Sequence, residues 1–394
     1  MNNDTCDRPD YSVIISYFQS SFHLTMAVLC YSLLALVSVS LNICNIIVFT
    51  RPQMRQVSMN VVLTALACSD FFFAITLWAN QSCVSLFRYF DTAGVLKPVA
   101  YDVILFVSYP WMKTYYTCSS WYVILASVER YLALCHPFFH TVLKEPKWMS
   151  VVSASVFTMA LILNIPAFME FSLDLSQTQG ALKPSSVRPL VTEYYFYFRM
   201  LGHFAIPFVL LVFLNGSIIW TLYQMRRIRQ ECTSNMRREV RGTTMLFAYI
   251  LMYLLCHSLP TANYFMESLF KDWFLNCNAL IALTLKDIQH LLLFCNMTFS
   301  FIIYFLTGTK FRAIFFYMIG SKRLISHGVY GRSCQTHMQI NSSVSAVTVP
   351  ESKRSKTRAP NLINAQDYSL GCYGKLLPVT NGKKYSCDAT ADDL

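Results

Sequence analysis

The sequence predicts an all-α membrane protein: a bundle of seven transmembrane helices, followed by an amphipathic surface helix and a disordered cytoplasmic tail. Three observations predict this fold class. Of the 394 residues, 55% are hydrophobic and only 13% are charged, which is about half the charged share of an average soluble domain. Seven long stretches are almost free of charge, and the basic residues gather on one side of the predicted topology.

The seven predicted spans are residues 24–50, 56–87, 103–128, 148–169, 200–225, 242–266 and 288–309. Only Asp70 interrupts the second span and only Lys113 the third. Each stretch exceeds the roughly 20 residues that a helix needs to cross ~30 Å of hydrocarbon. An odd number of spans places the two termini on opposite sides of the membrane.

The distribution of lysine and arginine predicts the orientation, because basic residues near helix ends stay cytoplasmic. With the N-terminus outside, the outer segments hold eight basic and eleven acidic residues, whereas the inner loops hold eleven and four. The tail from Lys310 adds twelve basic and five acidic residues. We therefore expect a multi-pass plasma-membrane protein with an extracellular N-terminus. Its basic inner face would attract anionic lipid and acidic protein surfaces, and the net charge of +11 gives no reason to expect nucleic-acid binding.

The segment after the seventh span predicts a surface helix. Phe311, Ile314, Phe315 and Met318 follow i, i+3, i+4, i+7 spacing, which places them on one apolar face. From Ser321 the composition turns polar without a helical period, which is typical of disorder. The predicted regions are an extracellular tail (1–23), the seven-helix domain (24–309), the surface helix (310–320) and the disordered tail (321–394).

Few of the fourteen cysteines fall outside the spans and the reducing cytoplasm. Of Cys6, Cys83 and Cys277, at most two can pair, and Cys6–Cys277 is the predicted bridge. Two N-x-S/T sequons face outside in this topology. Asn3 lies in the outer tail and Asn80 at the end of the second span, and both are candidate glycan sites.

Polar side chains inside the spans are costly and therefore informative. Asp70 is central in the second span. Four polar residues from other spans are candidate interaction partners of its carboxylate: Asn42, Ser119, Asn296 and Ser300. They either satisfy one another and join the helices, or they line a small cavity that holds a cation against the carboxylate. The cation would be an allosteric sodium ion, and we expect no other cofactor.

Four motifs occur in a recognisable order. They are Leu66-Ala67-Cys68-Ser69-Asp70, Glu129-Arg130-Tyr131 followed by Cys135-His136-Pro137, Ile206-Pro207-Phe208, and Ser300-Phe301-Ile302-Ile303-Tyr304 before Gly308-Thr309-Lys310-Phe311-Arg312. Together they resemble the rhodopsin-like G-protein-coupled receptors over residues 24–320. The closer resemblance is to invertebrate FMRFamide-type neuropeptide receptors, through Arg51-Pro52-Gln53-Met54-Arg55, Leu63-Thr64-Ala65-Leu66-Ala67-Cys68-Ser69-Asp70, Asn164-Ile165-Pro166 with Glu170, Leu214-Asn215, and Asn263 with Glu267.

The resemblance implies a receptor that binds a short amidated peptide outside and activates a heterotrimeric G protein inside. The implied coupling residues are Glu129, Arg130, Tyr131, Arg237, Arg238 and Arg241. Glu129 would hold Arg130 at rest until helix movement frees it. Pro207, Pro260 and Tyr304 are the implied activation switch, since proline removes a backbone donor and permits a bend. Serines in the tail are candidate phosphorylation sites for arrestin docking.

Two departures from the family pattern stand beside these matches. Ser258 occupies the place of the aromatic residue in the family's C-W-x-P motif, so an aromatic switch at that position does not carry over. The family's outer disulfide is also absent, because no cysteine starts the third span and residues 170–199 contain none.

The expected ligand follows from charges near the outer mouth. Met112 stands where amine receptors carry an aspartate, and the seventh span has no central lysine for a retinal Schiff base. Glu170, Glu267 and Asp287 would instead bind an arginine of the peptide, and we expect Lys113 to pair with an acid. The aromatic side chains that would receive an apolar group are Tyr109, Trp111, Tyr116 and Tyr264.

Two other function classes remain. A chemosensory serpentine receptor for a small molecule shares the same scaffold and differs at the pocket mouth. A transporter or an enzyme is a distant alternative, because the spans carry no run of paired carboxylates, no metal-ligand spacing and no nucleophile–base set.

Overall fold

The computed structural model describes residues 21–87, 99–136, 139–140, 145–174, 176, 182–228, 234–270, 278–319, 368–370 and 376–378. Side chains are described within these ranges except at 21, 99, 199, 204, 225–228, 234–246, 249, 268 and the two C-terminal strands. The predicted disordered tail therefore falls almost wholly outside the described residues. Its described part differs from the expectation, because strands β3 (Tyr368–Leu370) and β4 (Leu376–Pro378) pair antiparallel.

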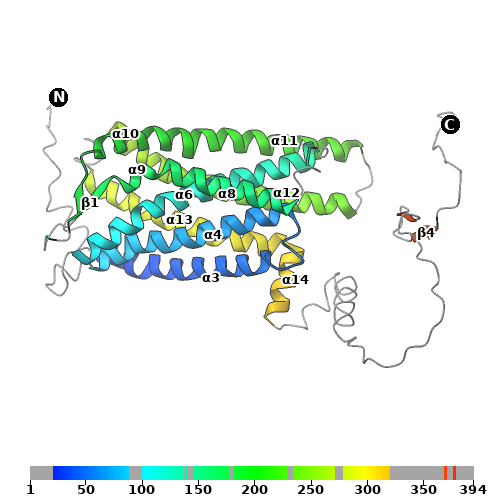
Figure 1. The fold of residues 1–394 in the computed structure, drawn as a ribbon, viewed down its shortest axis with the longest axis horizontal. Coiled ribbons are helices and arrows are strands. Elements are labelled where there is room, and N and C mark those ends of the chain that lie inside the picture. The colour runs from blue at the N-terminus through cyan, green and yellow to red at the C-terminus, as the bar shows by residue number, and fades with distance from the viewer. Residues whose placement is uncertain are drawn as a thin grey trace, which may run out of the picture. The chain divides into compact units, whose positions relative to one another are not determined.

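Seven long helical segments run side by side in residues 21–307 as far as these are described, as the sequence predicts (Figure 1). Their elements are α2 (Ser21–Thr25), η1 (Met26–Cys30) and α3 (Tyr31–Phe49); α4 (Ser58–Trp78) and η2 (Ala79–Cys83); α6 (Val99–Cys135); α8 (Pro146–Leu163); α10 (Arg188–Phe198), η3 (Arg199–Ala205) and α11 (Ile206–Ile228); α12 (Ser234–Leu269); and α13 (Ala279–Thr307). The segments labelled η are π-helical turns.

Five of these segments are long and apolar enough to cross a membrane. They are Phe22–Phe49, Ser58–Phe87, Pro146–Leu163, Arg188–Gln224 and Ala279–Thr307. Helices α6 and α12 are just as long but more polar. Helix α6 packs against α4, α8, α11 and α12 and so lies inside the bundle, which explains why it can carry polar side chains that a lipid-facing helix cannot.

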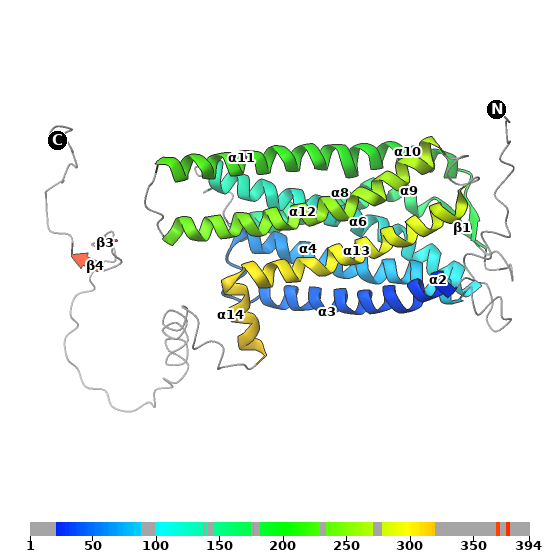
Figure 2. The ribbon, with the colours of Figure 1, turned by 180° about the vertical axis from the view of Figure 1, so that it is seen from behind.

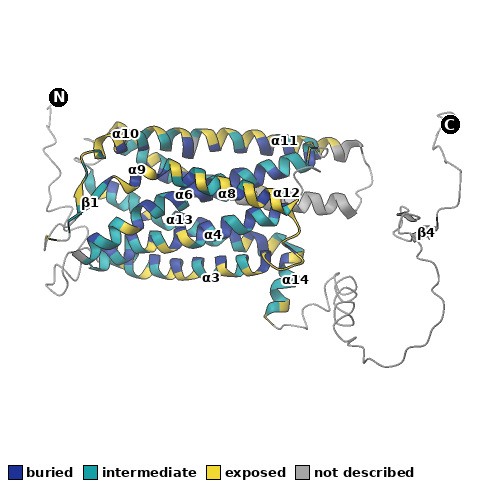
Figure 3. Cartoon of the chain, viewed as in Figure 1, coloured by how far each residue is buried: buried dark blue, intermediate teal, exposed yellow. Residues whose placement is uncertain are grey.

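The helices follow one another around α6, from α8 through α4, α3, α13 and α12 to α11. Helix α3 packs against α4 and α13, α13 against α12, and α12 against α11. Positions coloured as buried lie mostly between neighbouring helices, and exposed positions lie mostly on the outer faces of the bundle (Figure 3). Many of these exposed side chains are large and apolar, such as Leu33, Leu36, Phe213 and Trp220, as expected for a surface that faces lipid.

Local sequence explains two interruptions. The fourth segment ends at Leu163 and resumes as α9 (Ile165–Phe168), because Pro166 cannot donate the hydrogen bond that would continue the helix. The fifth segment contains the π-helical turn η3, where a Cβ on Gly202 would lie 2.8 Å from the Phe198 ring. Only glycine fits that close approach.

The two ends of the bundle differ. Strands β1 (Phe171–Leu173) and β2 (Leu182–Pro184) pair in the register Ser172 to Lys183 at one end, here called the hairpin end. Helix α14 (Thr309–Met318) leaves the opposite end, here called the α14 end (Figure 2). A helix is thus present where the surface helix was predicted, and its apolar face packs onto the bundle through Phe311, which is 2% exposed.

We predict that Phe311→Ala lowers stability by about 3 kcal/mol, a typical loss for a buried phenylalanine. The Phe311 ring packs against the rings of Phe49, Phe301 and Tyr304, with distances between ring centroids of 5.3, 5.7 and 6.2 Å. Thermal unfolding of the purified protein measures the loss. Tyr317→Ala, which changes an exposed residue of α14, is the control, and equal melting temperatures for the two variants would contradict the prediction.

Candidate functional site

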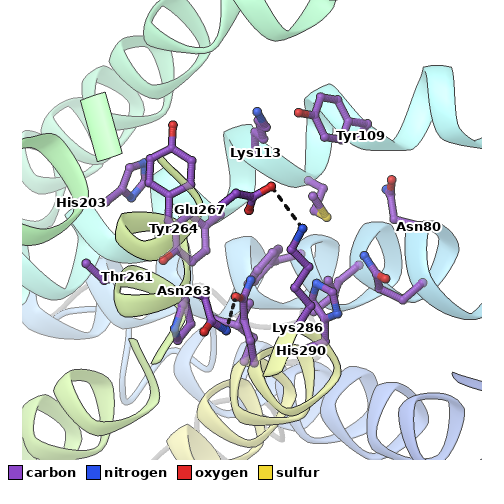
Figure 4. A pocket seen from close by; sticks show the side chains of 18 of the residues that line it. Asn80, Tyr109, Lys113, His203, Thr261, Asn263, Tyr264, Glu267, Lys286 and His290 are labelled. Carbon is purple, nitrogen blue, oxygen red and sulfur yellow. Dashed lines mark hydrogen bonds and ion pairs between the residues drawn. The ribbon is translucent and has the colours of Figure 1, made fainter. Parts of the chain in front are cut away.

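A cavity of about 400 Å³ opens between α4, η2, α6, η3, α12 and α13 (Figure 4). Three helices contribute to it with helical periodicity. Tyr109, Met112, Lys113 and Tyr116 come from α6, and Lys286, Gln289, His290 and Leu293 come from α13. Helix α12 adds Pro260, Thr261, Asn263, Tyr264 and Glu267, while the remaining lining residues are Phe73, Leu77, Asn80, Gln81, Leu105 and His203.

Six of the nine predicted ligand-binding residues line this cavity: Tyr109, Met112, Lys113, Tyr116, Tyr264 and Glu267. The sequence reasoning missed His203, Asn263, Gln289 and His290. For Gln289 and His290, the available signal was the i, i+3, i+4 spacing of the polar residues Lys286, Gln289 and His290 on α13. His203 had no such signal, because the π-helical turn η3 changes the period at that point.

Trp111 does not line the cavity, contrary to the prediction. Its ring stacks on Tyr115 at 5.9 Å and meets Phe168 edge-on at 5.5 Å. It therefore packs α6 against α9. Trp111 comes one position before Met112, and the side chains of adjacent residues on a helix point about 100° apart.

Glu170 is also outside the cavity lining, because the hairpin uses it. Its Oε2 accepts a hydrogen bond from Tyr109 Oη at 2.9 Å and lies 3.7 Å from Lys113 Nζ, and its Oε1 lies 3.8 Å from Arg188 Nε. The Lys113 and Glu170 side chains are only about one-tenth exposed. Lys113 thus pairs with an acid as predicted, and its ammonium also lies 3.7 Å from the Tyr195 ring centroid.

These contacts tie the hairpin to α6 at the place where the sequence lacks a disulfide. Asp102 Oδ2 accepts the backbone N–H of Leu182 at 3.1 Å, and the Glu170 carbonyl accepts that of Ser185 at 3.0 Å. Within the hairpin, hydrogen bonds from Ser176 and Lys183 lower the pKa of Asp174 to about 2. The ionised Asp174 thus forms an exposed ion pair with Lys183, which adds only a little to the pairing of the two strands.

Asp287 likewise does not line the cavity, contrary to the prediction. Its carboxylate is buried and contacts His23 Nδ1 at 3.0 Å and Tyr31 Oη at 3.0 Å. The other ring nitrogen of His23 contacts Ser85 Oγ at 3.2 Å. The cluster joins the first, second and seventh helical segments at the hairpin end.

Glu267 is the acid that faces the cavity. Its Oε1 accepts a hydrogen bond from Lys286 Nζ at 3.2 Å, and each side chain is about one-third exposed (Figure 4). Nearby, Asn263 Nδ2 donates to the Leu285 carbonyl at 3.1 Å and to Gln289 Oε1 at 3.3 Å. The cavity thus offers a carboxylate, an ammonium and amide groups between aromatic walls.

The polar residues around Asp70 are all buried. Ser119 Oγ donates to Asp70 Oδ1 at 2.6 Å. Asn42 Nδ2 instead donates to the Met297 carbonyl at 3.2 Å and so joins α3 to α13, while Ser300 Oγ donates to the same carbonyl at 3.0 Å within α13. Among the described atoms, Asp70 Oδ2 and Asn296 Oδ1 have no hydrogen-bond partner. Such buried acceptors call for a donor or a cation.

At the α14 end, Glu129 is buried and has three contacts. Its Oε1 accepts from Ser58 Oγ at 2.6 Å and contacts His140 Nε2 at 3.3 Å, and its Oε2 lies 3.8 Å from Arg130 Nε. Tyr131 Oη contacts His136 Nε2 at 3.0 Å. The Glu129–Arg130 pair exists as predicted, whereas the side chains of Arg237, Arg238 and Arg241 lie outside the described residues.

The predicted switch residues lie on three different helices, α11, α12 and α13. Pro207 is in the first turn of α11, Pro260 is inside α12 at the cavity, and Tyr304 is buried against Phe49 at 5.2 Å. Ser258 is exposed and donates to the Leu255 carbonyl. Its neighbour His257 is buried inside the bundle.

The predicted modification sites have different outcomes. Asn3, Cys6 and Cys277 lie outside the described residues. Asn80 lines the cavity, and its Nδ2 donates to Ser108 Oγ at 2.7 Å and to the Thr76 carbonyl at 2.9 Å. Because this nitrogen is buried and engaged, the structure contradicts a glycan at Asn80.

The chain matches known proteins over most of its length. Residues 41–304 match the model of the 7 transmembrane receptor (rhodopsin family). The FMRFamide peptide receptor frpr-18 of Caenorhabditis elegans is 26% identical over 86% of this chain and 79% of its own length. The FMRFamide receptor of Drosophila melanogaster is 26% identical over 72% of this chain and 52% of its own length. A short-wave-sensitive opsin of Danio rerio is 23% identical over 72% of this chain.

We predict that Glu170→Gln loosens the hairpin, because it removes the charge that Lys113 and Arg188 contact while keeping the side chain's size. Hydrogen exchange at the amides of Leu182 and Ser185 should accelerate at least about threefold. Mass spectrometry measures this exchange. Glu193→Gln, at an exposed position of α10, should leave it unchanged, and equal exchange in both variants would refute the charge-based attachment.

Proposed function

Because this chain belongs to the rhodopsin family of seven-transmembrane receptors, we propose that it is a cell-surface receptor for a short amidated neuropeptide of the RF-amide class. As a member of that family it is a multi-pass plasma-membrane receptor that signals through a heterotrimeric G protein, and it is not an enzyme. We place the N-terminus and the hairpin end outside and the α14 end in the cytoplasm. The excess of basic residues in the inner loops supports this orientation.

The observation that carries the proposal is the cavity, which Glu267 alone lines among the acidic residues that the structure describes. A volume of about 400 Å³ lies within the usual range for ligand pockets. Glu267 offers two oxygens to a guanidinium, and Tyr109, Tyr116 and Tyr264 offer faces and edges to an aromatic side chain. An arginine next to a phenylalanine satisfies both, and two of the similar proteins are receptors for FMRFamide peptides.

Binding would exchange partners at Glu267. An incoming guanidinium replaces Lys286 as the ion-pair partner of the Glu267 carboxylate. The Lys286 ammonium then donates hydrogen bonds to water or to carbonyl groups of the peptide. The exchange is inexpensive because both side chains are one-third exposed, and partly exposed ion pairs contribute little free energy.

Signalling requires the α14 end to open. Glu129 restrains Arg130, whose planar guanidinium can otherwise bind backbone carbonyls of the G protein. Pro260 lets α12 bend, and Tyr304 can then occupy the vacated space. Arg237, Arg238 and Arg241 would face the G protein. Arrestin binding to a phosphorylated tail and contact of the basic face with anionic lipid are further parts of the proposal.

One observation favours the chemosensory alternative. Glu267 pairs with Lys286, and Glu170 pairs with Lys113, so an uncharged small molecule can enter without separating charges. The peptide proposal requires such a separation.

We expect cells that express the chain with a calcium or cAMP reporter to respond to RF-amide peptides. Glu267→Gln should lower their potency about tenfold or more, the usual effect of losing a charge-assisted hydrogen bond. Asp174→Asn removes an exposed carboxylate of the hairpin and should not change potency. Silence to every amidated peptide, with a response to a small odorant, would support the chemosensory function instead.

We further propose that a sodium ion binds at Asp70. The unpartnered Asp70 Oδ2 and Asn296 Oδ1 are oxygen ligands of the kind that hard cations prefer, and Ser119 holds the carboxylate in place. Asn42 and Ser300 would support the site through α13.

Sodium should therefore raise the melting temperature of the purified receptor by a few degrees relative to N-methylglucamine at equal ionic strength. Asp70→Asn should abolish the difference. Ser120→Ala, which removes a hydroxyl that donates to the Tyr116 carbonyl and not to Asp70, should retain it. The site is refuted if sodium has no effect, or if its effect survives Asp70→Asn.

A further inference from the structure

Four aromatic rings form a stacked column that begins at the wall of the cavity. His203 from η3 stacks on Tyr116 from α6 at 4.8 Å between centroids, and Tyr116 stacks on His257 from α12 at 5.2 Å. His257 stacks in turn on Tyr253 at 4.0 Å. The three interplanar angles are 27–28°. The column connects the fifth, third and sixth helical segments through ring faces.

Two rings of the column line the cavity and the other two do not. Tyr116 and His203 are lining residues, whereas His257 and Tyr253 are buried below them. His257 lies three residues before Pro260, which also lines the cavity. A group that presses on Tyr116 therefore acts on α12 close to the position where that helix can bend.

Hydrogen bonds fix the column from both sides. Tyr116 Oη and His257 Nδ1 are 2.9 Å apart. Thr117 Oγ1 contacts His203 Nε2 at 3.2 Å and accepts from Asn164 Nδ2 at 2.9 Å, so the α8 end also supports it. In the part of the chain that the structure describes, His257 Nε2 has no hydrogen-bond partner. An unsatisfied buried nitrogen disfavours this arrangement and is relieved if α12 moves.

The inward face of α12 explains why His257 and not Ser258 is in this position. Ile250, Tyr253, His257, Pro260 and Asn263 are buried at intervals of three and four residues. Ser258 lies about 100° round the helix from His257 and is exposed. The residue that the motif comparison singled out thus faces away from the cavity.

We propose that Tyr116 and His257 are the positioning pair that couples ligand contact to the bending of α12. The inference rests on the proposed receptor function. In the conformation described here, the stack and the Tyr116–His257 hydrogen bond hold α12 against α6. A ligand group that displaces Tyr116 breaks this bond and frees α12 to bend at Pro260.

Basal G-protein activation tests the pair without any ligand. Nucleotide exchange on a purified G protein is measured in membranes that hold equal amounts of each full-length variant. Tyr116→Phe keeps the ring and removes the hydrogen bond, so it should raise the basal rate about fivefold, the shift that one net hydrogen bond produces in a two-state equilibrium. His257→Phe should do the same. The double variant should give no further increase, because both changes remove one interaction.

Ser258→Ala is the matched control on the same turn and should behave as the unchanged receptor. A purely structural role would lower the melting temperature or the surface level without raising the basal rate per receptor. The proposal is overturned if Tyr116→Phe and His257→Phe leave the basal rate unchanged, if their effects add, or if Ser258→Ala matches them. Because no peptide is used, failure of the RF-amide assignment cannot produce these outcomes.

Discussion

The structure depends on one constraint: polar groups inside a bundle surrounded by lipid must bond to one another, because no bulk water can replace a lost partner. Helix α6 carries most of this requirement. Ser119 bonds Asp70 of α4, Tyr122 bonds the Ser153 carbonyl of α8, and the Tyr115 carbonyl accepts from Ser69. These bonds fix the position of the central helix, and its position sets the shape of the cavity.

This constraint also shows what the sequence was able to predict. Charge-free length alone located the seven helices, and the spacing of Phe311, Ile314, Phe315 and Met318 located α14. The ends were less predictable. Helix α6 extends from Val99 to Cys135, well beyond its charge-free run, because a helix continues into water where no proline or cap stops it. The π-helical turn at Arg199–Ala205 depends on tertiary packing that no local pattern reveals.

The sequence predicts which helix faces line the cavity, but it does not predict which acidic side chains are available to a ligand. Periodicity places Tyr109, Met112 and Tyr116 on one face of α6, and the cavity contains all three. Which acids are available is a different question, because it depends on partners far away in the sequence. Asp287 is bound by His23 and Tyr31, and Glu170 by Lys113 and Arg188. Only the assembled bundle distinguishes these acids from Glu267.

The location of the conformational switch follows from comparing the ends of α6 with its middle. The Lys113–Glu170 pair lies toward the hairpin end and Glu129–Arg130 toward the α14 end, with Glu170 and Glu129 nearly buried. Separating either pair removes a charged partner from a nearly buried carboxylate, and breaking a buried ion pair costs about 3–5 kcal/mol. The bond between Tyr116 and His257 in the middle involves no ion pair, and breaking a bond between uncharged groups costs about 1 kcal/mol net. A movement that starts at the middle of α6 and leaves both ends paired is therefore the least expensive first step, and Tyr116, one of the two partners in that bond, lines the cavity.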